Sequence, residues 1–245
     1  MKSFIPWIGG KSLLAKKITA EFPEEFDRYI EVFGGGGSVL FATDKHADTE
    51  VYNDANGELV NLFRCIKYHP DELAREIDGY VNSREIFYDL AERLKCPGFT
   101  DIQRAAMFYV RIKISFGADT RSFGCVKTGN KLRTARFAEI SERLRNVVIE
   151  HKDFADLIKV YDRKNALFYC DPPYHTTERH YAEKFTEDDH CRLRNTLENI
   201  KGKFVLSYND DEFVRELYSS YNIIPVERQN NISSGTFREL IIKNY

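Results

Sequence analysis

One stretch of the chain decides the fold: Ala166-Leu167-Phe168-Tyr169-Cys170-Asp171-Pro172-Pro173-Tyr174. Its first five residues are apolar and rich in aromatic side chains, a pattern typical of a buried strand in a parallel sheet. The two prolines have no N–H group to give to a sheet ladder, so the strand must end before them. A stiff loop therefore follows at the carboxyl end of the strand, where open α/β sheets place their ligands.

The same loop carries groups suited to activating an aromatic amine. An amino group on a heteroaromatic ring is a poor nucleophile, because its lone pair is drawn into the ring. The Asp171 carboxylate and the Pro172 carbonyl can each accept an N–H bond from such an amine and stabilise the positive charge that develops on it. Tyr174 can stack on the face of the ring. Taken alone, the tetrapeptide fits a Pro-Pro turn with an Asp helix cap equally well.

A second strand and loop lie near the amino terminus. Residues 28–33 predict a strand, and four glycines, Ser38 and an apolar helix start at residues 39–42 follow it. Strand, glycine loop and helix open a nucleotide-binding α/β unit, in which missing Cβ atoms let a ligand approach the backbone. The next strand ends at Asp54, the position where such folds hold ribose hydroxyls. Asp54 is alternatively the N-cap of a helix over residues 55–67.

The segment that precedes this unit contains Gly9-Gly10-Lys11-Ser12. A phosphate-binding loop of the triphosphatase type is not favoured, because Ile5 stands where that motif needs a glycine and no strand comes before it. A tight turn at the start of a helix over residues 13–22 fits better. There Lys11 and backbone N–H groups can receive a small anion such as a carboxylate, and Trp7 would form a wall of the same pocket.

The alternation of strands and helices stops between residues 67 and 145. Helical patterns run over residues 70–95 and 101–115, and a basic, glycine-punctuated segment with a predicted hairpin tip at residues 126–132 follows. Residues 111–136 carry seven Lys or Arg and one acid, although the whole chain has a net charge of −2. This basic stretch is either a phosphate-binding surface or an ordinary solvated face.

We therefore expect two structural units. Residues 1–66 and 146–245 would form one α/β domain around a parallel sheet, and residues 67–145 an inserted, mainly helical recognition domain with a basic hairpin.

Composition excludes several other classes of protein. With 245 residues, 42% hydrophobic and 30% charged, the chain reads as an ordinary globular protein. It has no apolar run of about 18 residues and no signal-peptide core, so we expect a cytoplasmic protein without a membrane segment. Its five cysteines form no C-x-x-C pair, which predicts reduced thiols and no metal site.

Together these segments resemble the Dam-like, D12-class family of DNA adenine-N6 methyltransferases over nearly the whole chain. Asp171 to Tyr174 match the catalytic motif of that family in full. Four other segments are similar to its motifs in the family's order: Pro6-Trp7 with Gly9-Gly10-Lys11, Glu31 with Phe33, Gly35, Gly37 and Ser38, Asn53-Asp54, and Ser207 with Asn209 and residues 232–235. The resemblance implies a Rossmann-like, S-adenosylmethionine-dependent methyltransferase sheet that carries the inserted DNA-recognition domain.

The resemblance also implies the chemistry. The methyl donor would be S-adenosylmethionine, held by Trp7, Lys11, Phe33, Gly35, Gly37, Asp54, Asp153, Phe154 and Asp171. The target adenine would leave the DNA stack, with Asp171 and Pro172 binding its N6 amine, Pro173 stiffening the loop and Tyr174 stacking on the ring. Transfer would be direct, without a metal or an enzyme-bound intermediate, and Asp171 would not remove a proton beforehand.

The recognition sequence stays open. Relatives that read GATC usually carry an Asn-Gly-Leu-x-Arg type of segment, whereas here residues 115–121 keep the glycine and not the asparagine. GATC and another short site, read by a phage-type or orphan enzyme, are equally plausible recognition sequences. The sequence does not indicate whether a restriction endonuclease partner exists. The expected partner is double-stranded DNA, which the enzyme would bind as a monomer. We expect it to be associated with the nucleoid, in a bacterial or phage context. The candidates for base or phosphate contacts are Arg121, Lys127, Asn130 and Arg133.

Two alternatives remain at this point. Cytosine-N4 methylation uses the same amine chemistry, although that class more often has Ser in place of Asp171. A catalytically inactive DNA-binding relative is the other, although neither residues 171–174 nor residues 35–37 look degraded.

Overall fold

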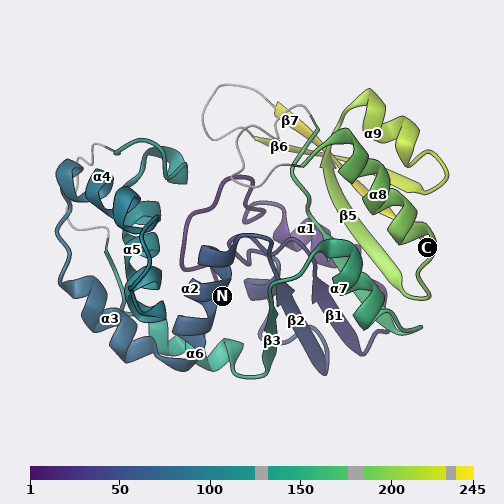
Figure 1. Cartoon of the computed structure of the whole chain (residues 1–245). Coiled ribbons are helices and arrows are strands. Elements are labelled where there is room, and N and C mark those ends of the chain that lie inside the picture. Colours follow the sequence, from purple (N-terminus) through teal and green to yellow (C-terminus); the bar gives the residue numbers. More distant parts are fainter. Residues whose placement is uncertain (125–131, 176–184, 230–235) are drawn as a thin grey trace.

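The computed structural model of the chain describes residues 1–124, 132–175, 185–229 and 236–245. Within these residues one seven-stranded sheet has the order β3-β2-β1-β4-β5-β7-β6 (Figure 1). Strands β1 to β5 are parallel to one another, and β7 runs antiparallel between β5 and β6. The strands are β1 Arg28–Glu31, β2 Thr49–Asn53, β3 Val147–Glu150, β4 Ala166–Cys170, β5 Lys203–Asn209, β6 Asn222–Gln229 and β7 Thr236–Lys243. This topology confirms the expected Rossmann-like α/β sheet.

Strand β4 lies at the centre of the sheet, and all five of its residues are buried. Because side chains alternate along a strand, Leu167 and Tyr169 enter the core on one face, and Phe168 and Cys170 enter the core on the other. Helices α7, α8 and α9 contribute to the second core, and α1, α2, α5 and α6 to the first. The central strand is therefore covered on both sides, which explains its continuous apolar sequence.

The helices follow the sequence pattern with local differences. Their bounds are α1 Ala15–Ala20, α2 Gly57–Tyr68, α3 Pro70–Asp78, α4 Arg84–Arg93, α5 Asp101–Ile114, α6 Phe137–Leu144, α7 Phe154–Tyr161, α8 Glu187–Glu198 and α9 Glu212–Leu217, with short 3-10 turns η1 Leu40–Ala42 and η2 Phe116–Ala118. The helical pattern expected over residues 70–95 is two helices, because the chain leaves helical geometry after Gly79. The helix start expected at residues 39–42 is only the turn η1.

The segment that interrupts the alternation forms helices α3 to α6, and Figure 1 shows α3, α4 and α5 grouped at one side of the sheet. The longest, α5, begins in a capping box between Thr100 and Gln103 and packs its buried side chains against α2 and α3. The predicted hairpin tip, except Leu132, lies outside the described residues. Among the helices that the structure describes, none is both long enough and apolar enough to cross a membrane.

Candidate active site

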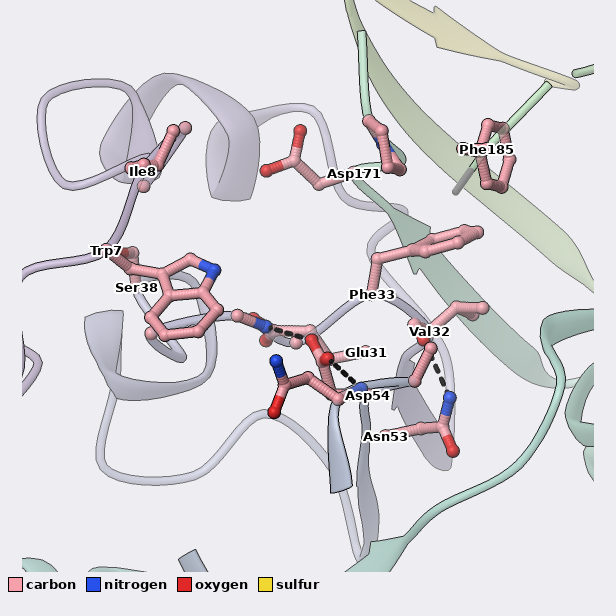
Figure 2. Close-up of a pocket in the computed structure, with 18 of the residues that line it drawn as sticks. Trp7, Ile8, Glu31, Val32, Phe33, Ser38, Asn53, Asp54, Asp171 and Phe185 are labelled. Atoms are coloured by element: carbon pink, nitrogen blue, oxygen red, sulfur yellow. Dashed lines mark hydrogen bonds between the residues drawn. The ribbon is translucent and has the colours of Figure 1, made fainter. Parts of the chain in front are cut away.

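A cavity of about 290 Å³ opens where the parallel strands end. The residues that follow β1, β2, β3 and β4 all contribute to its wall, as expected for a ligand site in an open α/β sheet. Figure 2 shows Trp7 at the left of this space, Asp54 below it, Phe33 and Phe185 at the right, and the Asp171 carboxylate above it.

Most residues predicted for cofactor binding meet in this cavity. Its lining includes Trp7, Lys11, Phe33, Gly35, Asp54, Asp153, Phe154, Asp171 and Pro173, together with Arg121 from the inserted segment. Of the other predicted residues that the structure describes, Gly37, Pro172, Tyr174 and Arg133 do not line it. Gly37 has a φ of +68°, and a Cβ atom there would lie 2.9 Å from the Phe41 ring, so this glycine serves the turn and the packing beneath it.

The glycine loop is tied to the ends of both neighbouring strands. Gly34 N donates to Asn53 O at 2.7 Å, and Gly35 N donates to Asp54 Oδ2 at 2.8 Å. Gly35 has a φ of +50°, and a Cβ atom on it would lie 2.8 Å from the Trp7 indole. A side chain at this position would therefore meet the indole and fill the wall of the cavity.

The two oxygens of Asp54 have different partners. Oδ2 accepts from the glycine loop, and Oδ1 accepts from Asn56 N at 2.8 Å. The N-cap of α2 is Asn56, whose side chain accepts from Leu59 N at 3.0 Å. The helix-cap alternative for Asp54 is therefore wrong, and its carboxylate instead braces the loop at the cavity wall.

Lys11 is the charged partner of Asp171. Its side chain is only 5% exposed, and Nζ lies 2.7 Å from the Asp171 carboxylate and 2.7 Å from Gly9 O. The same nitrogen lies 4.7 Å from the centroid of the Tyr174 ring. The sequence suggested a lysine that receives an anion from a ligand, whereas the structure pairs it with a carboxylate of the protein.

Asp171 also accepts a hydrogen bond from a side chain on the neighbouring strand β5. Ser207 Oγ donates to Oδ1 at 2.8 Å, and Tyr169 OH lies 3.0 Å from Ser207 Oγ. Ser207 has one hydroxyl proton, so when that proton points to Asp171 the Tyr169 hydroxyl must be the donor to Ser207. Burial raises the pKa of Asp171 above its ordinary value, and the charge and hydrogen bond of Lys11, with the bond from Ser207, oppose that rise.

Tyr174 lies behind the cavity with both ends of its side chain enclosed. It is 6% exposed, and its hydroxyl donates to Glu239 Oε2 at 2.6 Å. Burial, and the negative charges of Asp171 and Glu239, raise the pKa of the Tyr174 phenol well above its ordinary value. Sequence reasoning missed Glu239, although an acid directly before the apolar residues 240–242 of a predicted strand was a usable signal.

An aromatic cluster closes the far end of the cavity. The ring centroids of Phe33, Phe154 and Phe185 lie 5.6 to 5.9 Å from one another. Arg192 places its guanidinium 4.0 Å from the Phe154 ring and binds both carboxylate oxygens of Asp153, at 2.7 and 2.9 Å. The hydrogen bonds from Arg192 hold the pKa of Asp153 below its usual range.

Phe185 and Arg192 were not identified from the sequence. Phe185 precedes α8 and Arg192 lies within it, and nothing in their local pattern distinguishes them from residues of a core face and a solvated face.

The floor of the cavity contains a buried acid. Glu31 is 2% exposed and accepts a hydrogen bond from Tyr29 OH at 2.6 Å. Burial, with the nearby Asp171 charge, raises its pKa to about 8, while the Tyr29 hydroxyl opposes the rise. Burial therefore favours the neutral form of Glu31 at the floor of the cavity.

The predicted DNA contacts are only partly described. Arg121 lies at the rim of the cavity, next to a turn in which Asp119 accepts from Arg121 N at 2.9 Å and Ser122 N at 3.1 Å. The backbone carbonyl of Arg133 accepts from Tyr109 OH at 2.7 Å. Lys127 and Asn130 lie outside the described residues. In the part of the chain that is described, no group of three or more His, Cys, Asp or Glu side chains could hold a metal ion.

Known proteins similar to this chain are DNA methyltransferases. Residues 7–232 match the model of the D12 class N6 adenine-specific DNA methyltransferases. The Type II methyltransferase M1.LlaDCHI of Lactococcus lactis subsp. cremoris is 29% identical, over 100% of this chain and 96% of its own length. The Type II methyltransferase M.CviBI of Paramecium bursaria Chlorella virus NC1A is 26% identical over 100% of both chains.

A DNA adenine methylase of Haemophilus influenzae is 24% identical over 99% of this chain and 91% of its own. The family match covers nearly the whole length, including the glycine loop and the loop after β4 that together border the cavity. The chain therefore belongs to the D12 class of N6 adenine-specific DNA methyltransferases.

Proposed function

We propose that this methyltransferase transfers a methyl group from S-adenosylmethionine to N6 of an adenine that has left the stack of double-stranded DNA. One observation carries the proposal: the Asp171 carboxylate faces the same cavity that the glycine loop and Asp54 border. A carboxylate that can hold an amine therefore lies next to a site shaped for a nucleoside.

The residues of the cavity fit the proposed cofactor. Asp54 and the glycine loop suit the ribose, because the loop backbone approaches the cavity where a Cβ atom would collide with Trp7. The aromatic cluster of Phe33, Phe154 and Phe185 suits an adenine ring, with Asp153 beside it. The bound sulfonium would supply an activated methyl group, and the negative charge of Asp171 would favour that cation.

The amine of the target base would be held by Asp171 and the Pro172 carbonyl. Both are acceptors, and they would draw the N6 lone pair out of conjugation and stabilise the charge that appears on nitrogen. In the structure Lys11 Nζ already lies 2.7 Å from Asp171, so an ammonium group occupies a position that a base amine would share or take over. Pro172 and Pro173 would hold the direction of these acceptors.

We further propose that residues 67–145 form the recognition domain. Arg121, Lys127, Asn130 and Arg133 remain the candidates for contact with bases or phosphates. Arg121 is supported by its place at the rim of the cavity, where the inserted segment meets the methyl-transfer site. The Type II relatives suggest that the enzyme protects DNA in a modification system. The DNA sequence that it recognises would be found by mapping the methylated adenines.

The test is a transfer assay with S-adenosylmethionine and unmethylated genomic DNA, followed by digestion to nucleosides. N6-methyladenine is expected, and N4-methylcytosine in its place would overturn the proposal. Asp171→Ala should abolish transfer and keep cofactor binding measurable by titration calorimetry. Asp210→Ala is the matched control, because it removes a carboxylate that pairs with Arg215 and does not line the cavity. Full turnover by Asp171→Ala would refute the role of that carboxylate.

A further inference from the structure

We propose that Glu239 is a positioning residue for methyl transfer: it holds the Tyr174 hydroxyl and so fixes the loop that carries the Asp171 carboxylate. The inference rests on the proposed function, because it assigns a role within the same site. Glu239 comes from β7, the antiparallel strand, 65 residues beyond Tyr174 in the sequence.

The hydrogen bond between the two side chains is short and enclosed. Tyr174 OH lies 2.6 Å from Glu239 Oε2, and the two residues are 6% and 1% exposed. Hydrogen bonds to an ionised acceptor are stronger than those between neutral groups. A phenol that turned away would leave a buried acceptor without this donor, which is costly in a protein interior.

The strand register brings Glu239 to this place. Glu239 pairs with Asn209, the last residue of β5, and β5 lies beside β4, whose end carries Asp171 and Tyr174. The antiparallel strand β7 thus places the Glu239 carboxylate next to Tyr174 in the loop that follows β4.

The ring is thereby constrained on several sides. The backbone is stiffened by Pro172 and Pro173, and the hydroxyl is held by Glu239. Lys11 Nζ lies 4.7 Å from the centroid of the ring, and the Tyr208 ring lies 6.0 Å away at 33°. Asp171 and Tyr174 belong to the same stiff loop, so a contact that fixes the far end of the phenol also fixes the direction of the Asp171 carboxylate.

The competing explanation is that the bond only stabilises β7. The chain offers a matched control, because Tyr161 OH donates to Glu150 Oε1 at 2.8 Å between α7 and β3. Neither of these residues lines the cavity. Glu150→Ala therefore removes the same kind of bond without touching the proposed site.

The experiment compares Glu239→Ala, Glu239→Gln and Glu150→Ala in the full-length enzyme. Single-turnover transfer, cofactor affinity and thermal melting are measured on each, and 2-aminopurine fluorescence reports base extrusion at the position that the wild type methylates. We expect Glu239→Ala to slow transfer about 10- to 100-fold, the range of loss that misplaced groups cause, with cofactor affinity changed less than about threefold. Glu239→Gln should recover most of the rate, because its amide oxygen still accepts from the phenol, and Glu150→Ala should keep the wild-type rate.

The proposal is overturned if Glu239→Ala and Glu150→Ala lose stability alike and both transfer at the wild-type rate, or if Glu239→Gln is as slow as Glu239→Ala. Should Glu239→Ala fail to fold, Tyr174→Phe takes its place, since it keeps the ring and removes the hydroxyl. A slower rate with normal cofactor affinity then supports the proposal, and an unchanged rate overturns it. Failure of the proposed function itself would look different, since the wild type would form no N6-methyladenine.

Discussion

Replacing Lys11 by Met removes an ammonium and leaves the Asp171 carboxylate buried with its charge uncompensated. The methionine keeps an unbranched apolar side chain in the same space, so packing changes little. The ion pair is enclosed, with side chains 5% and 16% exposed and 2.7 Å between the charged atoms. Breaking a buried pair by removing one partner costs about 3 kcal/mol, which for a chain of this size lowers the melting temperature by about 6 to 12 °C.

The loss depends on pH in a defined direction. Burial already raises the pKa of Asp171, and the charge and hydrogen bond of Lys11 oppose that rise. Without Lys11 the pKa of Asp171 should rise further, because the charge and the hydrogen bond that oppose the effect of burial are gone. A carboxyl whose pKa is higher in the folded state is best tolerated when protonated, so the variant regains stability as pH falls and is most impaired above the new pKa.

The assay is thermal melting of wild type and Lys11→Met at about pH 8 and about pH 5.5, with single-turnover transfer measured across the same range. The difference in melting temperature should be larger at the higher pH, and the acidic limb of the rate profile should move to higher pH. Lys17→Met is the control, because Lys17 lies on α1 and donates to the Glu227 carbonyl away from the cavity. An equal loss of stability at both values, with an unmoved acidic limb, would refute the coupling between Lys11 and Asp171.

Two further predictions concern the cofactor side of the cavity. Arg192→Ala removes the partner of Asp153 and should weaken cofactor binding about fivefold in titration calorimetry. The effect is modest because the ion pair and the contact with Phe154 are only partly shielded from solvent. Unchanged affinity would exclude Arg192 from the site. Gly35→Ala combines a φ of +50° with a Cβ atom 2.8 Å from the Trp7 indole, and should cost about 1 to 2 kcal/mol of stability and most of the cofactor affinity. Gly98→Ala has a φ of +97° and no atom within 4 Å, so it should lose stability and keep cofactor affinity; equal cofactor binding by both variants would contradict the clash with Trp7.

Local rules predicted most of the sheet and its ligand-binding edge. Double proline ended β4 after Cys170, and a glycine run after β1 marked the loop, because both depend on backbone geometry that the residue type itself restricts. The apolar spacing over residues 70–95 did not show where one helix ends and the next begins, because the same spacing continues from α3 into α4. The alternative interpretation of Asp54 placed the N-cap of α2 two residues too early. Asp54 and Asn56 are both residue types that favour an N-cap, but the Asp54 carboxylate accepts from Gly35 N in the glycine loop.

Short-range patterns of this kind, with the order of five motifs, were enough for the sequence to determine the fold class, the family and the loop that carries Asp171. Which charges face that loop was decided by the tertiary structure alone. Lys11, Ser207 and Glu239 lie 160, 36 and 68 residues away in the chain from Asp171, with the first two bonded to it and the third bonded to Tyr174. The packing of β5 and β7 beside β4 brings Ser207 and Glu239 to this loop, and Lys11 reaches it from the segment before α1. Hydrogen bonds and ion pairs act over a few ångströms and leave no periodic signal in the sequence.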